Sequence, residues 1–407
     1  MIRKYLFLPT PITVVGLGLA VAICMPARAD EQDTLNVSIG ESFAHDDNLF
    51  RLPAGVDPAT LGLGKSARGD NIRTDTLSLT ADKSYSLQHF HLGASYNNFH
   101  FSNYGFLNYN TKNVDGRWNW SLTPNITGVI GAERVQSFNN FADYQNYVRS
   151  VRTTDNLHAN TEFGSIGALR FVAGVAENTS SSSTRVQQDG DTRTRSGQAG
   201  LRYVSAADNS VGYLFRENKV EWTKRGLDPI NLYDTDARQT DHELNALWHI
   251  ASQATLDGAI AHINRHHDTF GVRDYSGTNG RLNINWMPET RVRVVFGARR
   301  DYASWWTSTA SYTVTDTFNI IPTWQFSEKI TLRGRIEQSK RNFFGPVVAT
   351  TQDDRHDKLN TAQIGLDWTP DRSLVIGTAV EKSRRSTNAP GLDFTDTTTS
   401  INAKVLF

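Results

Sequence analysis

The stretch Thr395–Phe407, TDTTTSINAKVLF, decides the fold class of this chain. Apolar or small residues occupy every second position at its end, namely Thr399, Ile401, Ala403, Val405 and Phe407. Side chains alternate between the two faces of a β-strand, so one face of this segment is apolar and the other is mostly polar. The segment therefore predicts a half-solvated strand rather than a helix.

The same period of two recurs along the chain, for example in residues 77–82, 90–96, 114–122, 280–286 and 362–368. Short turns such as 123–125, 287–289 and 369–371 alternate with longer polar stretches at 178–192, 224–239, 345–355 and 384–393. Short connections on one side and long loops on the other are typical of outer-membrane barrels. The pattern predicts a single antiparallel up-and-down transmembrane β-barrel of about 18 strands, with 16 as the alternative, and with both ends in the periplasm.

The amino terminus predicts a cleaved signal peptide. Arg3 and Lys4 precede an apolar run that ends at Ala27-Arg28-Ala29, a small-x-small cleavage pattern. We expect residues 1–29 to be removed and residues 30–407 to form the barrel, with 44–72 as a long first loop segment. An uncleaved membrane anchor and a lipoprotein attached through Cys24 are the alternatives. Cys24 is the single cysteine, so the mature chain has no disulfide and no thiolate site.

Composition supports the barrel. Lys plus Arg equals Asp plus Glu, at 42 each, which argues against a nucleic-acid partner. Aromatic residues make up 10% of a chain whose mean hydropathy is −0.45, as suits lipid outside and water inside. A periplasmic β-sandwich would also alternate, but these strands are long and their apolar faces are rich in Gly, Ala and Thr. Trp118, Trp120, Trp286, Trp324 and Trp368 each precede a short turn, which predicts an interfacial girdle.

Charged residues recur on the face opposite the apolar one. Charge on a lipid face costs about 2–4 kcal/mol for Arg or Lys near the bilayer midplane, so we assign these residues to the lumen. They either brace the wall as paired charges or line a translocation path, and an arginine group at 291, 293, 333 and 335 would attract anionic solutes. The predicted lumen residues are Asp82, Asp115, Arg117, Glu243, Asp257, Arg281, Arg291, Arg293, Arg333, Arg335, Asp367 and Glu381.

The sequence predicts no cofactor, no metal site and no catalytic residue. On a strand, His262 and His266 would lie roughly 13 Å apart, and His89 and His91 share a face without an assigned third ligand. Phosphate-cradling and Gly-x-Ser-x-Gly motifs are absent from the sequence. Asp46–Phe50 reads as a loop. We expect a non-enzymatic protein, with a barrel hydrolase acting on lipid or glycan as an alternative.

The stretch Phe43–Pro58, FAHDDNLFRLPAGVDP, resembles the opening of the exopolysaccharide-operon outer-membrane proteins called EpsL, which accompany exosortase systems. The similarity continues through residues 106–109, 117–120, 141–144 and 152–154. This resemblance implies a β-barrel of porin type that acts in the synthesis or export of an extracellular polysaccharide. A general or anion-preferring porin is the alternative.

These expectations define a location and a set of partners. The protein is expected in the outer membrane of a Gram-negative bacterium, in contact with membrane lipid and with a polysaccharide chain. The aromatic strand ending at Phe407 resembles the signal by which barrel-assembly machinery recognises its clients. Other export-complex proteins are further candidate partners.

Overall fold

The computed structural model describes residues 35–139, 141–166, 168–305, 307, 309–345 and 354–407. The predicted signal peptide at 1–29, with Cys24, lies outside these residues. The described chain forms one sheet whose strands follow one another in sequence order. They are β1 (Leu35–Asp46), β2 (Asp70–Tyr85), β3 (Gln88–Phe101), β4 (Tyr109–Thr123), β5 (Ile126–Phe138), β6 (Val151–Ile166), β7 (Leu169–Ser182), β8 (Thr192–Val204), β9 (Ser210–Trp222), β10 (Asp236–Ala251), β11 (Ala254–His267), β12 (Tyr275–Glu289), β13 (Val292–Ser304), β14 (Tyr312–Gln325), β15 (Ile330–Phe344), β16 (His356–Asp371), β17 (Leu374–Thr387) and β18 (Phe394–Leu406).

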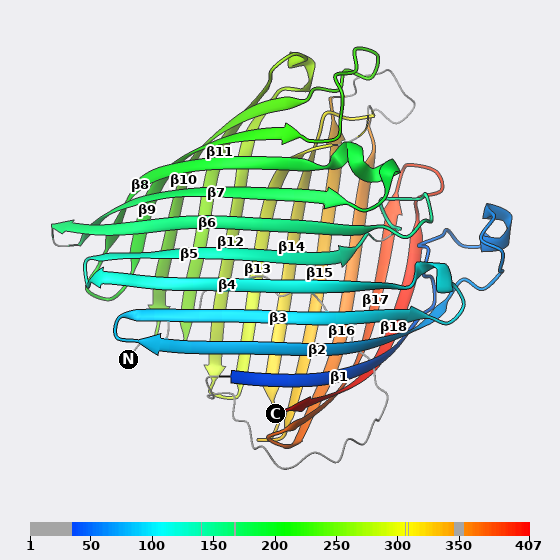
Figure 1. Ribbon diagram of the computed structural model, residues 1–407, viewed down its shortest axis with the longest axis horizontal. Helices are drawn as coiled ribbons and strands as arrows, with labels where there is room; N and C mark the ends of the chain where they lie inside the picture. The colour runs from blue at the N-terminus through cyan, green and yellow to red at the C-terminus, as the bar shows by residue number, and fades with distance from the viewer. Residues whose placement is uncertain (1–34, 140, 167, 306, 308, 346–353) are drawn as a thin grey trace.

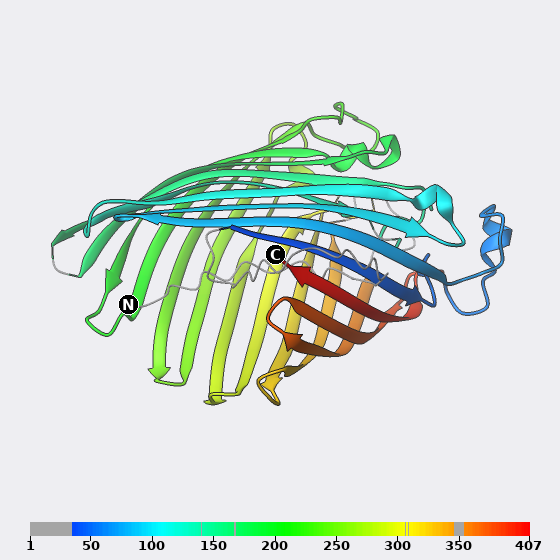
Figure 2. The same cartoon turned by 60° about the horizontal axis from the view of Figure 1, so that its bottom comes forward.

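The sheet closes on itself. Each strand pairs antiparallel with the next, and β1 pairs with β18, with Ile39 opposite Val405 and Phe43 opposite Ile401. Val37 and Phe407 exchange backbone hydrogen bonds of 3.2 and 2.8 Å at the seam. Figures 1 and 2 show the resulting ring of tilted strands. The predicted up-and-down barrel is confirmed, with 18 strands and not 16.

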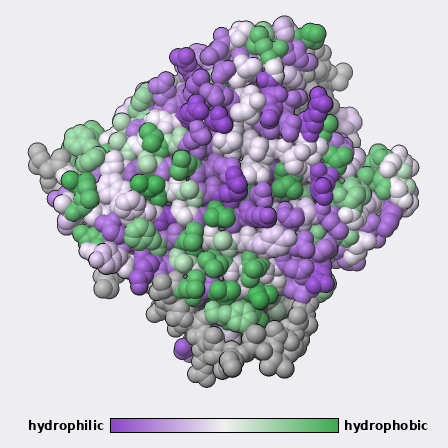
Figure 3. Space-filling model, in the orientation of Figure 1, coloured by the Kyte–Doolittle hydropathy of each residue, from purple (hydrophilic) through white to green (hydrophobic). Residues whose placement is uncertain are grey.

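The outer wall carries the apolar face. Ile336 is 63% exposed and Ile364 is 66% exposed, as expected of side chains that contact lipid instead of a protein core. Figure 3 shows hydrophobic side chains gathered in patches on one side of the surface, between polar ones. Trp118, Trp286 and Trp368 lie near the short turns with 40–45% of their surface exposed, as a girdle at that end requires.

The outer wall also carries charges, which the sequence analysis did not expect. Arg134 shares the outward phase of Ile130, and Asp155 shares that of Leu157; their side chains form an ion pair of 2.6 Å across β5 and β6. Both lie toward the long loops. The strands have 12–16 residues, whereas a tilted strand crosses a bilayer in roughly 9–11. The rule that charges face the lumen therefore fails beyond the apolar belt.

Connections differ between the two ends, as predicted. Two-residue turns such as 124–125 and 252–253 close one end, and long loops close the other. The first long loop spans 47–69, because residues 44–46 belong to β1 and 70–72 to β2. Some polar residues that the sequence predicts as loop instead extend the strands. Asn178–Ser182, for example, pairs with β6.

In the described part of the chain, helices occur only in the long loops. They are four short 3-10 helices: η1 (Pro58–Leu61), η2 (Gly105–Leu107), η3 (Arg185–Gly190) and η4 (Gly271–Arg273). Within the described ranges, no helix has the length and apolar character needed to cross a membrane.

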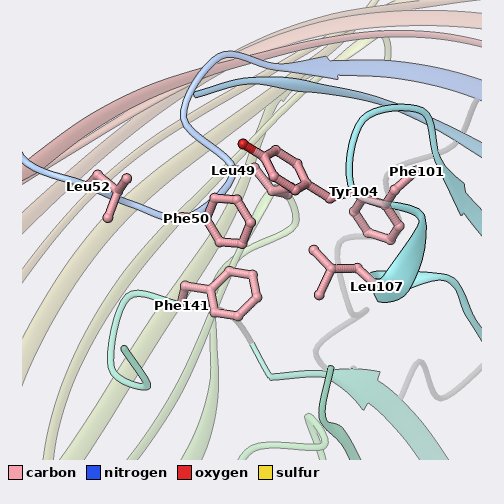
Figure 4. Close-up of a cluster of buried hydrophobic side chains, with 7 residues drawn as sticks. All are labelled: Leu49, Phe50, Leu52, Phe101, Tyr104, Leu107 and Phe141. Carbon is pink, nitrogen blue, oxygen red and sulfur yellow. The ribbon is translucent and has the colours of Figure 1, made fainter. Parts of the chain in front are cut away.

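The largest buried hydrophobic cluster lies among the loops instead of within the barrel wall. Phe50 is fully buried and lies 4.7 Å from the ring of Tyr104 and 5.0 Å from that of Phe141, measured between centroids. Figure 4 shows these rings meeting near Leu107. The cluster joins the loops at 47–69, 102–108 and 139–150, and comprises Leu49, Phe50, Leu52, Phe101, Tyr104, Leu107 and Phe141.

Asn48 fixes the turn that delivers Phe50. Its amide nitrogen donates to the carbonyl oxygens of Leu52 and Thr395, both at 2.9 Å, and its amide oxygen accepts from the Leu52 N–H. Arg51 contacts Asp46 at 2.8 Å and Asp396 at 3.4 Å. The segment predicted as a simple loop is therefore an ordered turn that is held against β18.

Candidate functional site

The barrel interior collects the charged residues predicted for the lumen. Asp115 and Arg117 alternate with the outward Trp118, and the strand ladders carry this phase around the ring. The other residues on the inward face are Asp82, Glu243, Asp257, Arg281, Arg293, Arg333, Arg335, Asp367 and Glu381. Arg291 is the exception, because it lies in the turn between β12 and β13, where its carbonyl accepts the N–H of Gln325 at 2.8 Å.

Three inward arginines lie against carboxylates. Arg333 contacts Asp367 at 2.6 Å, and Arg335 contacts Glu337 at 2.7 Å. Arg281 approaches Asp257 at 3.7 Å. Because of this pairing, these cations do not present bare positive charge to a solute.

The predicted arginine group at 291, 293, 333 and 335 does not form. Strand β14 separates β13 from β15, so the two halves of the group are not on neighbouring strands. Arg293 donates to the Asn285 amide oxygen at 2.6 Å, and Arg291 is outside the strands. The prediction that these four arginines form one group was wrong, and the interior is closer to the alternative of paired charges that brace the wall.

Amide side chains lie flat along the inner wall. At four inward glycines, an asparagine from an adjacent strand extends over the glycine. A Cβ atom added at any of these glycines would lie less than 3 Å from the amide oxygen, closer than real Cβ contacts. The pairs are Asn160 over Gly174, Asn245 over Gly212, Asn319 over Gly297 and Asn402 over Gly377. The glycines thus keep the amides against the wall and out of the lumen.

A hydrogen-bonded chain of histidines and carboxylates links β2, β3 and β4. His91 lies between Asp82 and Asp115, with N···O distances of 2.9 and 3.0 Å. His89 Nε2 lies 3.4 Å from Asp82, and His89 Nδ1 lies 3.0 Å from the Ser84 hydroxyl. The sequence placed these residues on inward faces but could not align the strands. Across the described part of the chain, no three possible metal ligands converge on one point.

One loop crosses the mouth of the barrel. Residues 139–150 leave the wall between β5 and β6, and the Asp143 carboxylate accepts hydrogen bonds from Arg341 at 3.1 Å and from Arg385 at 3.2 Å. These arginines lie on β15 and β17. Because β6 and β15 are 15 − 6 = 9 strands apart in a ring of 18, the loop reaches the opposite wall.

Neighbouring loops form a braced rim. Arg273 is almost fully buried and donates to the carbonyls of Leu232 at 2.6 Å and Ala310 at 3.4 Å. Burial of the Asp234 carboxyl opposes its ionisation, but backbone N–H groups of Phe270 and Thr269 outweigh burial and hold its pKa below the usual value. The loop at 223–235 is therefore fixed to the one at 268–274.

Arg225 reinforces the same rim. Burial lowers the pKa of its guanidinium to about 10, with the nearby Arg273 as the next cause. Its guanidinium lies 5.0 Å from the centroid of the Trp222 ring and 4.6 Å from that of Tyr233, in the range of cation–π contact.

Comparisons with known proteins find a sequence similarity over the second part of the chain. Residues 238–407 match the family model described as "Putative beta-barrel porin 2". No curated protein matches the chain. Similar solved structures include OccK2 (OpdF) of Pseudomonas aeruginosa, at 13% identity and a TM-score of 0.49, covering 92% of this chain and 98% of that one. A BenF-like porin from Pseudomonas fluorescens Pf-5 has 11% identity, a TM-score of 0.49 and coverages of 93% and 99%. From β10 to β18, this closed barrel is therefore similar in sequence to a β-barrel porin family.

Proposed function

We propose that this protein is an outer-membrane channel for polar, largely uncharged carbohydrate, and that it serves the export of an extracellular polysaccharide. The observation that carries the proposal is the inner wall, where several charges are paired and amides lie flat over glycines. The exposed apolar outer wall supports placement in the outer membrane. The resemblance to EpsL-type proteins is the basis for proposing a polysaccharide as the transported molecule.

An inner wall with paired charges and many amides suits carbohydrate better than anions. Sugar hydroxyls donate to carboxylates and accept from amides and guanidinium groups, so each contact is weak and replaceable by water. Conduction needs binding that is weak and repeated along the path. An anion-preferring porin, the alternative, would need uncompensated cations, and the pairs at Arg333 and Arg335 do not favour it.

The loop at 139–150 adds a condition. A polymer must pass beside this loop or displace it, because Asp143 holds it to the far wall. The proposal therefore includes a mouth whose opening depends on that attachment.

Planar-bilayer recording tests the channel. We expect an ionic current with a reversal potential near zero in a potassium chloride gradient, and partial block by neutral oligosaccharides. A strongly anion-selective current would support the anion porin instead, and absence of current would refute the channel.

Deletion of the gene tests export separately. Loss of surface polysaccharide, restored by the wild-type gene, is expected. Unchanged polysaccharide would remove the export role and leave the channel standing.

A barrel hydrolase has one place where it can be tested. Ser84, His89 and Asp82 form a nucleophile–base–carboxylate order on the inner wall. Hydrolysis of a soluble ester by the purified barrel, lost in Ser84→Ala, would support that function. Equal rates for wild type and variant would exclude these residues as its catalytic site.

A further inference from the structure

Within the described residues, a group of cations on the outer wall forms no ion pair with a carboxylate. Lys340 on β15 lies directly opposite Lys358 on β16, and Asn360 beside Lys358 lies opposite Arg384 on β17. Lys382 lies two residues before Arg384 on the same face of β17. All four cations are exposed. We call Lys340, Lys358, Lys382 and Arg384 the outer cationic patch. Like charges placed directly opposite on adjacent strands are destabilising.

Several outward cations on other strands are neutralised by carboxylates. Arg195 contacts Glu177 at 2.8 Å, and Lys219 contacts Glu221 at 3.1 Å. Asp316 lies opposite Lys340, but Arg300 engages both of its oxygens, at 2.6 and 2.8 Å. Among the described residues, no ion pair joins the patch to a carboxylate. The patch therefore needs an anion from outside the chain.

The surroundings of the patch define the chemistry of that anion. On the same strands, one to three outward positions nearer the short turns, lie the side chains of Ile336, Ile364 and Val380, all exposed. The side-chain amides of Gln338 and Asn360 lie between the cations. They are joined by a hydrogen bond of 3.0 Å. A ligand that fits this order carries phosphate at one end, hydroxyls behind it and acyl chains at the other.

We propose that the outer cationic patch binds the phosphate groups of a phosphorylated glycolipid in the surrounding leaflet, whose acyl chains lie on Ile336, Ile364 and Val380. The patch lies at the long-loop end of β15–β17, which is the extracellular side in outer-membrane barrels. Arg384 offers paired donors to a phosphate, and the lysines add point charges on either side.

Binding of diphosphoryl lipid A to the purified, folded barrel in detergent tests the proposal. The triple variant Lys340→Gln, Lys358→Gln, Arg384→Gln should bind on the order of 100-fold more weakly, because each cation near a charged headgroup contributes about fivefold. The control variant Arg134→Gln, Arg195→Gln, Lys219→Gln removes the same charge from outward sites that already face carboxylates. It should bind as wild type does, and both variants should keep the heat-modifiable gel mobility of a closed barrel.

Two further probes identify the source of the phosphate. Dephosphorylated lipid A should bind weakly to wild type and variant alike, and inorganic phosphate alone should bind far more weakly than the lipid. Equal loss of lipid binding in both triple variants, or no loss in the patch variant, would overturn the site. Inorganic phosphate binding as tightly as the lipid would overturn the lipid as its ligand.

Discussion

Replacing Asp143 with asparagine should release the loop at 139–150 from the far wall and open the mouth of the barrel. The Asp143 carboxylate accepts from Arg341 at 3.1 Å and from Arg385 at 3.2 Å. A hydrogen bond to a charged group contributes about 1.5–3 kcal/mol. Asp143 and Arg341 are each close to one-third exposed, so solvent screening reduces their share. Arg385 is almost fully buried and would lose a charged partner.

Taken together, the substitution should weaken the attachment by about 2–3 kcal/mol, which changes the ratio of released to attached loop by roughly 30- to 150-fold. Single-channel recording in planar bilayers measures this as longer dwell in the higher-conductance state. Asp155→Asn is the matched control, because it breaks an Arg–Asp pair of similar geometry on the outer wall. Conductance and dwell times identical to wild type in Asp143→Asn would refute the assignment of this loop as the constriction.

Four other predictions test the loop cluster, the rim and the inner wall. Phe50→Ala should lower the free energy of unfolding by about 3–5 kcal/mol in urea titrations, whereas Leu61→Ala, exposed in the same loop, should change it by less than about 0.5 kcal/mol. Arg273→Met should speed chymotryptic cleavage within 223–235, because it removes the donor to several loop carbonyls; unaltered cleavage would count against that role. The pKa of Asp234 lies below its ordinary 3.8, so its carboxylate should stabilise the rim above about pH 4 and cease to do so as the pH falls through the lowered pKa; amide exchange should show this acid dependence, and Asp234→Asn should abolish it. Gly297→Ala should push an amide into the lumen and reduce conductance, and an unchanged current would contradict the flat-amide wall.

The faces of the strands were predictable because alternation is a local property of the chain. Trp118 and Asp115 differ by an odd number of positions, so they must lie on opposite faces whatever the rest of the protein does. The assignment of eleven charged residues to the inner wall follows from that rule alone. Arg291 is the exception because β13 begins at Val292, one position after it, which leaves Arg291 in a two-residue turn without defined faces.

Pairing between strands was not predictable, because it depends on register. His91 lies between Asp82 and Asp115 only in the alignment that β2, β3 and β4 adopt. The same holds for Arg333 with Asp367. A sequence pattern therefore identifies which residues face inward, but it does not show which of them neutralise each other.

The loops were the least predictable part. Asp143 and Phe141 resemble ordinary polar-loop residues, and their partners lie far away in sequence, on β15, β17 and the loop at 47–69. Phe50 was a clue: a large aromatic in a polar stretch must be buried somewhere. Nothing local specified that three loops would bury it together.

The seam between β1 and β18 has a consequence for how the protein forms. Its hydrogen bonds join Val37 and Phe407, about 370 residues apart. Chain entropy grows slowly with loop length, at about 0.6 kcal/mol per doubling, so closing the ring costs only about 2 kcal/mol more than closing a 30-residue hairpin. The obstacle to closure is instead kinetic, because unpaired backbone N–H and C=O groups at the two strand edges are unfavourable in the hydrocarbon core of the membrane. We expect insertion to require a temporary strand partner at these two edges, a role suited to barrel-assembly machinery, and the seam to be the last contact made and the first to limit the rate of biogenesis.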